Sequence, residues 1–182
     1  KRNKLKALAI CATSYTTGQS VVWIQGRDIQ PWTRPQRLTK ETRITVDHVM
    51  AWAALPIFFP AIRIGNAWYG DGGVRLSAPL SPALHLGANR ILAVSTRYAR
   101  SQQDAGEAAI SEYPPPAQIL GIVMNAIFLD LIDQDASRMK RINKLIEKVP
   151  PDRRANMRPV RLLVIRPSRD LGRLAAEYEP AL

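Results

Sequence analysis

The sequence has little cysteine and histidine, the two residue types that bind most transition metals in proteins. Its 182 residues include one cysteine and two histidines. Cys11 cannot form an internal disulfide, which suggests a reducing compartment and a cytoplasmic protein, with peripheral membrane association as the alternative. Its apolar surroundings indicate a buried structural thiol. His48 and His85 have no histidine or cysteine nearby, so the spacing of a metal site is absent. We expect neither a metal nor a cofactor.

Two longer patterns are missing as well. No G-x-S-x-G turn, the strand-to-helix bend that exposes a nucleophilic serine, occurs anywhere in the chain. The longest nearly apolar run, Ile119–Ile132, is too short to span a bilayer. It favours a core helix, with an interfacial segment as the alternative.

The chain opens at Lys1 without an initiator methionine, and we expect a truncated start.

The charge is strongly one-sided. With 46% hydrophobic and 23% charged residues the chain is globular, and its net charge of +11 favours anionic partners such as phospholipid headgroups or nucleic acid. The arginines are scattered and aromatic residues do not alternate with them, which argues against nucleic acid. A basic surface that is merely solvated explains the composition equally well.

Local patterns predict the first elements. Apolar and β-branched runs indicate a hairpin over residues 6–25, and the polar, proline-containing residues 26–44 are expected to form a loop. Thr45 is typical of the N-cap of a helix that runs from Val46 to about Ala54. Leu55–Ile64 contains two prolines and is expected to be buried irregular chain.

The second half alternates helices and strands. Strands are predicted over residues 67–69, 91–95 and 161–165, and helices are predicted from Ser81 to a stop at Gly87, from about Ala117 to Glu147, and after Ser168 to Glu177. Residues 99–116, between the strand over residues 91–95 and the helix that begins at about Ala117, are expected to form a polar, proline-rich loop. The helix over residues 117–147 ends in an amphipathic stretch with basic residues on its polar faces. A helix followed by a buried strand is typical of α/β proteins.

The most informative run is Trp68–Val74, in which Asp71 stands among glycines directly after a short aromatic strand. Glycines let another backbone approach closely, and burial raises the pKa of a carboxylate and strengthens it as a base. The apolar run Ala54–Pro60 and Trp68 are expected to supply that burial. Asp71 is therefore a candidate proton acceptor. The alternative is an Asx-type turn residue before two glycines.

Several blocks in this order resemble the C-terminal half of a patatin-like phospholipase domain. They are Ala9–Thr13 with Thr17-Gly18, Ala53–Pro60, Tyr69–Gly73, Pro79–Ala83 with Leu86-Gly87-Ala88 and, more weakly, Ile165–Ser168 with Asp170–Gly172. The resemblance implies an α/β fold, part of a three-layer domain whose central, mostly parallel sheet is flanked by helices. Residues 1–98 correspond to the C-terminal half of the catalytic domain, residues 99–116 to a loop, and residues 117–182 to a helical extension with a final strand and short helix.

The resemblance also implies a lipid acyl ester hydrolase with a Ser–Asp dyad, acting on phospholipids or related esters. In that family a serine in a G-x-S-x-G elbow attacks the ester carbonyl, and the Asp of the D-G-[GA] turn takes the serine proton. Only Asp71, as proton acceptor, and Gly72 and Gly73, as the motif turn, match catalytic positions here. The nucleophile and the oxyanion loop are expected in a missing N-terminal half, so this chain alone is expected to be inactive.

The other candidate residues have plainer explanations. His48 suits a packed or cap-proximal position, and His85 lies near a helix end, where a cation suits the dipole. Ser14 and Ser20 flank the first turn and fit turn hydrogen bonds. An acyl-chain pocket and a plain hydrophobic core are equally good explanations for Trp52, Phe58, Phe59 and Trp68.

A non-catalytic binding function is the alternative to the hydrolase. The charge of +11 and the basic helix over residues 117–147 fit a non-catalytic module that binds anionic membrane surfaces or nucleic acid. The two functions are compatible, since an interfacial lipase benefits from basic lipid contacts.

Overall fold

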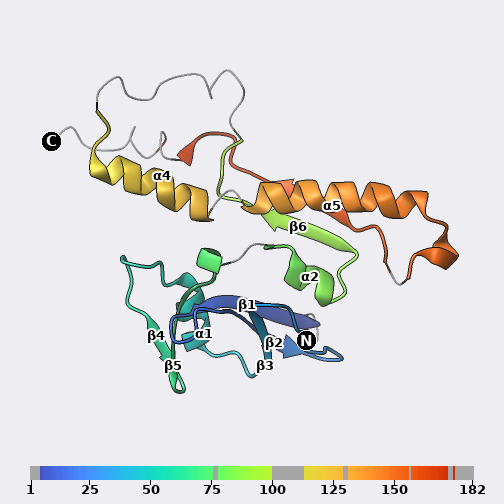
Figure 1. The fold of residues 1–182 in the computed structure, drawn as a ribbon, viewed down its shortest axis with the longest axis horizontal. Helices are drawn as coiled ribbons and strands as arrows, with labels where there is room; N and C mark the ends of the chain where they lie inside the picture. The colour runs from blue at the N-terminus through green and yellow to red at the C-terminus, as the bar shows by residue number, and fades with distance from the viewer. Residues whose placement is uncertain are drawn as a thin grey trace. The chain divides into compact units, whose positions relative to one another are not determined.

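The computed structural model describes residues 5–75, 78–99, 113–128, 131–155, 157–171 and 174. The chain divides into two compact units, residues 1–88 and residues 89–182, and each contains both strands and helices (Figure 1). The expected α/β composition is confirmed.

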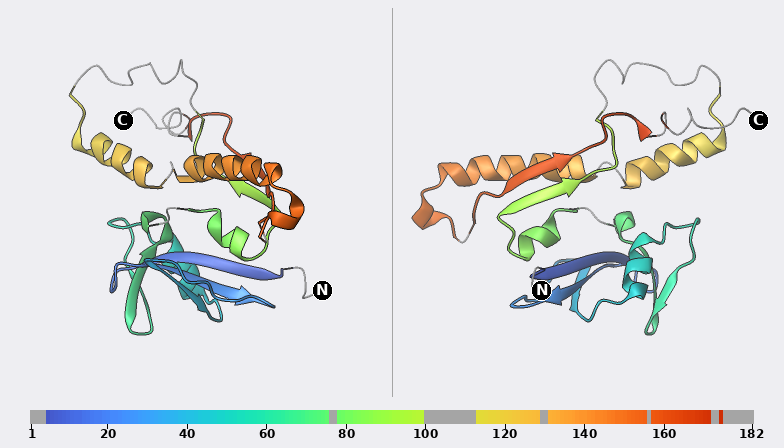
Figure 2. Two further views of the ribbon diagram at one scale, coloured as in Figure 1. Left: turned by 45° about the vertical axis from the view of Figure 1, so that its right-hand side comes forward. Right: turned by 180° about the vertical axis from the view of Figure 1, so that it is seen from behind.

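The first unit is built on a five-stranded sheet of order β3-β2-β1-β5-β4 (Figures 1 and 2). The strands are β1 (Ala7–Ser14), β2 (Ser20–Gly26), β3 (Arg37–Glu41), β4 (Ile62–Ile64) and β5 (Ala67–Asp71). β1 and β2 form the predicted antiparallel hairpin, and Gly18 in its turn has a φ of 67°. The short strand expected before Asp71 is β5.

Two expectations about this sheet are wrong. The expected central sheet is mostly parallel, but β1 pairs antiparallel with β2 and β5, and β4 pairs antiparallel with β5; only β2 and β3 are parallel. The expected loop over residues 26–44 contains β3, in which only Thr39 is buried. A strand at a sheet edge is held by its backbone pairing, so its side chains carry little of the usual apolar signal.

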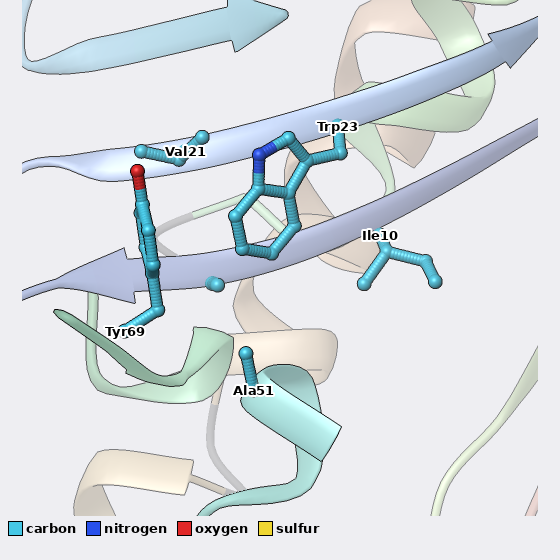
Figure 3. Packing of buried hydrophobic residues seen from close by; sticks show 6 residues of the cluster. Ile10, Val21, Trp23, Ala51 and Tyr69 are labelled. Atoms are coloured by element: carbon cyan, nitrogen blue, oxygen red, sulfur yellow. The ribbon is translucent and has the colours of Figure 1, made fainter. Parts of the chain in front are cut away.

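Helix α1 (Val46–Ala53) has the predicted bounds and N-cap, Thr45, with Asp47 in its first turn. Its buried residue Ala51 joins a core cluster with side chains of β1, β2 and β5: Ile10, Ala12, Val21, Trp23 and Tyr69 (Figure 3). The indole of Trp23 meets the Tyr69 ring edge-on, with centroids 4.9 Å apart. Because apolar area removed from water drives folding, this cluster fixes α1 against the sheet.

The chain after α1 departs from the expected buried segment. Ile57, Phe58 and Phe59 are exposed in turns, and Ile62–Ile64 form β4.

Beyond β5 come the 3-10 turn η1 (Gly72–Arg75) and the helix α2 (Ser81–His85). Helix α2 has a proline in its first turn, and Gly87 adopts a φ of 87° just beyond its end, as predicted.

The second unit contains a parallel two-stranded sheet of β6 (Arg90–Val94) and β7 (Arg161–Ile165), at the predicted positions. The long helix expected over residues 117–147 is two helices, α4 (Pro116–Phe128) and α5 (Leu131–Lys148), and the short turn η2 (Pro151–Arg153) follows α5. Most of the expected loop over residues 99–116, and of the final helix after Ser168, lies outside the described residues.

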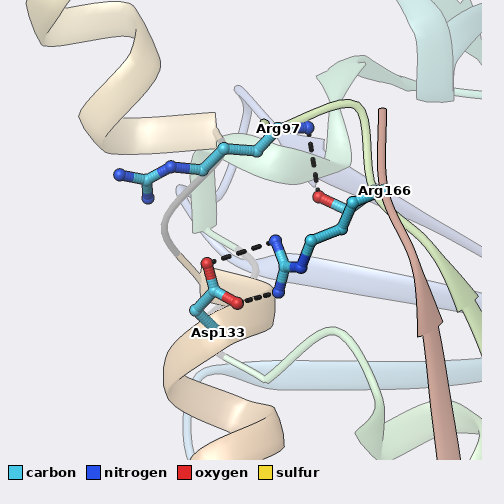
Figure 4. A network of polar contacts seen from close by, with 4 residues as sticks. Arg97, Asp133 and Arg166 are labelled. Carbon is cyan, nitrogen blue, oxygen red and sulfur yellow. Dashed lines mark hydrogen bonds and ion pairs between the residues drawn. The ribbon is translucent and has the colours of Figure 1, made fainter. Parts of the chain in front are cut away.

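Polar contacts join α5 to the chain around β7. The Arg166 guanidinium forms a two-pronged ion pair with Asp133 in the first turn of α5 (Figure 4). Ten residues further along the helix, the Asn143 side-chain amide donates to the Val160 carbonyl at 2.7 Å and accepts from the Val160 N–H at 3.0 Å. These pairs place Ala136, Met139 and Ile146 on the buried side of α5.

Candidate functional site

Asp71 is the last residue of β5 and is held by backbone contacts on both sides. Its N–H donates to the carbonyl of Ala54, the C-cap of α1, at 2.9 Å, and its carbonyl accepts from the Thr13 hydroxyl at 2.8 Å. In the antiparallel register Asp71 lies opposite Ala12, so its side chain is on the same sheet face as the core residues Ala12 and Tyr69. The C-terminal ends of α1 and of β1 therefore position this carboxylate together.

The Asp71 carboxylate is half-buried and asymmetrically bonded. Its Oδ1 accepts from the Gly73 N–H at 2.5 Å, whereas Oδ2 has no hydrogen-bond partner among the described residues. Burial raises the pKa of Asp71 above its ordinary value of 3.8, and the hydrogen bond from Gly73 partly opposes this. The Asx-type turn is thus present, and it leaves one carboxylate oxygen available to accept a proton.

The glycines around Asp71 leave room for neighbouring groups. A side chain at Gly72 would overlap the carbonyl of Cys11, and one at Gly70 would overlap the Tyr15 hydroxyl. Tyr15 is a site residue that the sequence did not indicate, since only the structure reveals that its ring lies over Gly70. Burial and the neighbouring charge of Asp71 both raise the pKa of Tyr15, so its phenol stays protonated.

The aromatic residues proposed as a pocket or core are exposed. Trp52, Phe58, Phe59 and Trp68 are each about half exposed or more, between 49% and 62%. Trp68 points away from Asp71, because alternate residues of a strand face opposite sides of the sheet. The expectation that Trp68, Phe58 and Phe59 desolvate Asp71 is therefore wrong for Trp68. These four exposed side chains form neither a closed pocket nor part of the buried core.

His48 is a cap-proximal, packed histidine, as its place in the sequence predicts. Its Nδ1 accepts from the Thr45 N–H at 3.1 Å and lies 2.8 Å from the Thr45 hydroxyl. Its ring meets Trp23 edge-on, with centroids 4.6 Å apart. Burial lowers the pKa of His48, against the opposing charge of Asp47, so the neutral ring is the form that caps α1.

His85 differs from its expected role as a helix-end cation. Its ring stacks on Trp32, with centroids 4.5 Å apart and planes 10° from parallel. Burial lowers the pKa of His85, and the positive charges of Arg34 and Arg37 lower it further. A neutral imidazole that stacks on an indole is a packing contact and not a dipole partner.

The hydroxyl and thiol candidates have structural partners. The Ser14 Oγ accepts from the Thr17 N–H at 3.2 Å within the first turn, as expected, whereas the Ser20 hydroxyl donates to the distant Arg75 carbonyl at 3.1 Å. Burial raises the pKa of Cys11 to about 11, which leaves an unreactive thiol at neutral pH. None of the three has the features of an activated nucleophile.

The described residues add three observations about sites. No group of three or more histidine, cysteine or acidic side chains comes together where a metal ion could bind. No helix in the described part of the chain has both the length and the apolar character needed to cross a membrane. A surface groove of about 550 Å³ lies in the second unit between α5 and residues 159–162, and no sequence motif points to it.

Comparison with protein-family models, with curated proteins and with solved structures found no match to this chain. The functional interpretation therefore depends on the motif and on the geometry around Asp71.

Proposed function

We propose that this chain forms part of a patatin-like lipid acyl hydrolase and supplies its proton acceptor, Asp71. The observation that carries the proposal is the state of this carboxylate: it is half-buried, its pKa is raised, and Oδ2 has no partner among the described residues. A carboxylate that only closed a turn would gain nothing from such desolvation. A base with a raised pKa takes a proton from a hydroxyl more readily than an ordinary aspartate does.

The proposed reaction is acyl transfer from a phospholipid or related ester. Asp71 Oδ2 takes the proton of a serine hydroxyl as the serine oxygen attacks the ester carbonyl carbon. The ester C–O bond then breaks, and the departing alcohol takes the proton from Asp71. Water repeats the sequence on the acyl-serine, with Asp71 again holding the proton, and the fatty acid leaves. The serine must come from outside these 182 residues, because they contain no nucleophile elbow.

Exposed apolar surfaces in each unit support a larger domain. Ile57, Phe58 and Phe59 are exposed just beyond the Ala54 carbonyl that anchors Asp71. In the second unit, one face of the parallel β6–β7 pair is bare: Leu92, Val94, Leu163 and Ile165 are all exposed. Parallel sheets are normally covered on both faces, so this pair is typical of a fragment of a wider sheet.

The test compares Asp71→Asn with the unmodified protein, both expressed from the complete reading frame that contains these residues. On phospholipid and lysophospholipid micelles, Asp71→Asn should lower turnover by about 100-fold or more, the usual contribution of a general base. The matched control is Asp28→Asn, which removes the same charge at an exposed turn residue whose φ of 54° asparagine tolerates.

Two results would contradict the proposal. Full turnover in Asp71→Asn would remove this residue from the mechanism. Ester turnover by the 182-residue chain alone, above that of its own Asp71→Asn variant, would show that the nucleophile has been misplaced.

A further inference from the structure

Helix α5 has an exposed face rich in basic residues, which we call the basic face: Arg138, Arg141, Lys144, Leu145 and Lys148. At about 100° per residue, Arg141, Lys144 and Lys148 project from the side of the helix opposite the buried residues Met139 and Ile146. Arg138 and Leu145 lie next to them along one border of that side. All five are exposed, and the Leu145 side chain is 63% exposed. The face thus combines four positive charges with an apolar side chain.

The acidic residues of α5 do not neutralise this face. Asp133 is ion-paired with Arg166, and Asp135 is on the inner side of the helix. Glu147 projects from the flank. Four like charges on neighbouring turns repel one another, and an anionic surface would relieve that repulsion.

The preceding helix, α4, is apolar in sequence and has several exposed side chains among its described residues. It contains no acidic or basic residue, and Ile119, Leu120, Ile122 and Val123 are each at least 40% exposed. The expectation of a core helix is therefore wrong for these side chains. These exposed apolar side chains are suited to enter the boundary between headgroups and acyl chains, while the neighbouring helix α5 supplies the charged face that an interfacial segment needs.

We propose that the basic face of α5, together with α4, binds the surface of a membrane that contains anionic phospholipids. Lysine and arginine attract the lipid headgroups, and Leu145 and the apolar side chains of α4 enter the interface. Nucleic acid fits less well, because a phosphate backbone would leave these apolar side chains in water. The inference does not rest on the proposed hydrolase, since it uses no residue near Asp71.

The experiment is co-sedimentation of the 182-residue chain with vesicles of phosphatidylcholine alone or of phosphatidylcholine mixed with phosphatidylglycerol. The test variant is Arg138→Gln/Arg141→Gln/Lys144→Gln, which keeps good helix formers on α5. The matched control, Arg27→Gln/Lys40→Gln/Arg43→Gln, removes three exposed charges from the first unit. The test variant should bind the mixed vesicles at least about tenfold more weakly than the control, which should bind almost as the unmodified chain does.

A second variant separates the apolar contribution from the charge. Leu145→Ser should weaken binding to the mixed vesicles by about threefold while leaving its salt dependence unchanged, because hydrophobic contacts are not screened by salt. Circular dichroism establishes that each variant folds. Asp71→Asn should bind as the unmodified chain does, so a failed hydrolase test would leave this result standing.

Three outcomes would overturn the inference: equal loss in the two triple variants, equal binding to neutral and anionic vesicles, or no binding to either. If a DNA duplex were bound with the same dependence on the basic face while vesicles were not, the partner would be nucleic acid instead.

Discussion

The side-chain amide of Asn143 forms two hydrogen bonds with the backbone of Val160, one to its N–H and one to its carbonyl. It acts as a strand would, satisfying both polar groups of a buried residue just before β7. Asn143→Leu should therefore lower the free energy of unfolding by about 2 kcal/mol, since two buried backbone groups lose their partners. Urea denaturation measures this, with the exposed Ser137→Ala on the same helix as control. A change below about 0.5 kcal/mol would show that water replaces the amide at no cost.

The close approach of Gly72 to the backbone of β1 predicts a steep cost for any side chain there. Gly72→Ala should destabilise the protein by about 3 kcal/mol, because the new methyl group meets the Cys11 carbonyl, which cannot move without disturbing β1. Gly70→Ala should cost only about 1 kcal/mol, because the Tyr15 side chain can swing aside.

Gly121→Ala supplies the control for both glycine variants. No atom lies near the position of its new methyl group, and the residue is in helix α4. It should be neutral or gain up to about 1 kcal/mol from helix propensity. Thermal melts of the three variants test this order, and a Gly72→Ala protein as stable as Gly121→Ala would contradict the packing.

The His48–Thr45 cap predicts stability that declines in acid. Because burial lowers the pKa of His48 in the folded state, the unfolded chain binds a proton more readily below the ordinary pKa of 6.5. The contribution of His48 is thus complete above that value and is lost as the pH falls toward the folded-state pKa. Protonation of Nδ1 also removes the acceptor for the Thr45 N–H.

Urea titrations at mildly acidic and neutral pH measure this effect. His48→Gln should reduce the loss of unfolding free energy between neutral and mildly acidic pH. His85 also has a lowered pKa, so His85→Gln removes the contribution of His85 to this loss but keeps the contribution of His48. An unchanged slope in His48→Gln would mean that the ring titrates alike in the folded and unfolded states.

The bare face of the β6–β7 pair predicts self-association of the 182-residue chain. In the parallel register Leu92 lies beside Leu163 and Val94 beside Ile165, so four exposed apolar side chains adjoin one another. Leu92→Thr/Leu163→Thr should shift the chain toward monomer in sedimentation velocity. The control, Leu8→Thr/Leu38→Thr, alters exposed leucines on strands of the other unit. A monodisperse, monomeric unmodified chain would contradict this prediction.

The sequence by itself determined the elements whose signals are local. Thr45 and the apolar spacing after it determined α1, the two apolar runs around Gly18 determined the β1–β2 hairpin, and the aromatic strand before the glycines placed Asp71 at a strand end. In each case the decisive interactions join residues close in the chain, where capping, turn and alternation rules apply directly.

Only the tertiary structure decided what depends on contacts between distant residues. Pairing with β2 made a strand of the mostly polar residues 37–41, and pairing with β1 set the antiparallel direction of β5. The same pairing brought Tyr15 over Gly70 and Cys11 against Gly72, which defines the surroundings of Asp71. The physical reason is that hydrogen bonds between backbones hold strands together whatever side chains they carry. The residues of a strand therefore do not specify which strand it pairs with or in which direction.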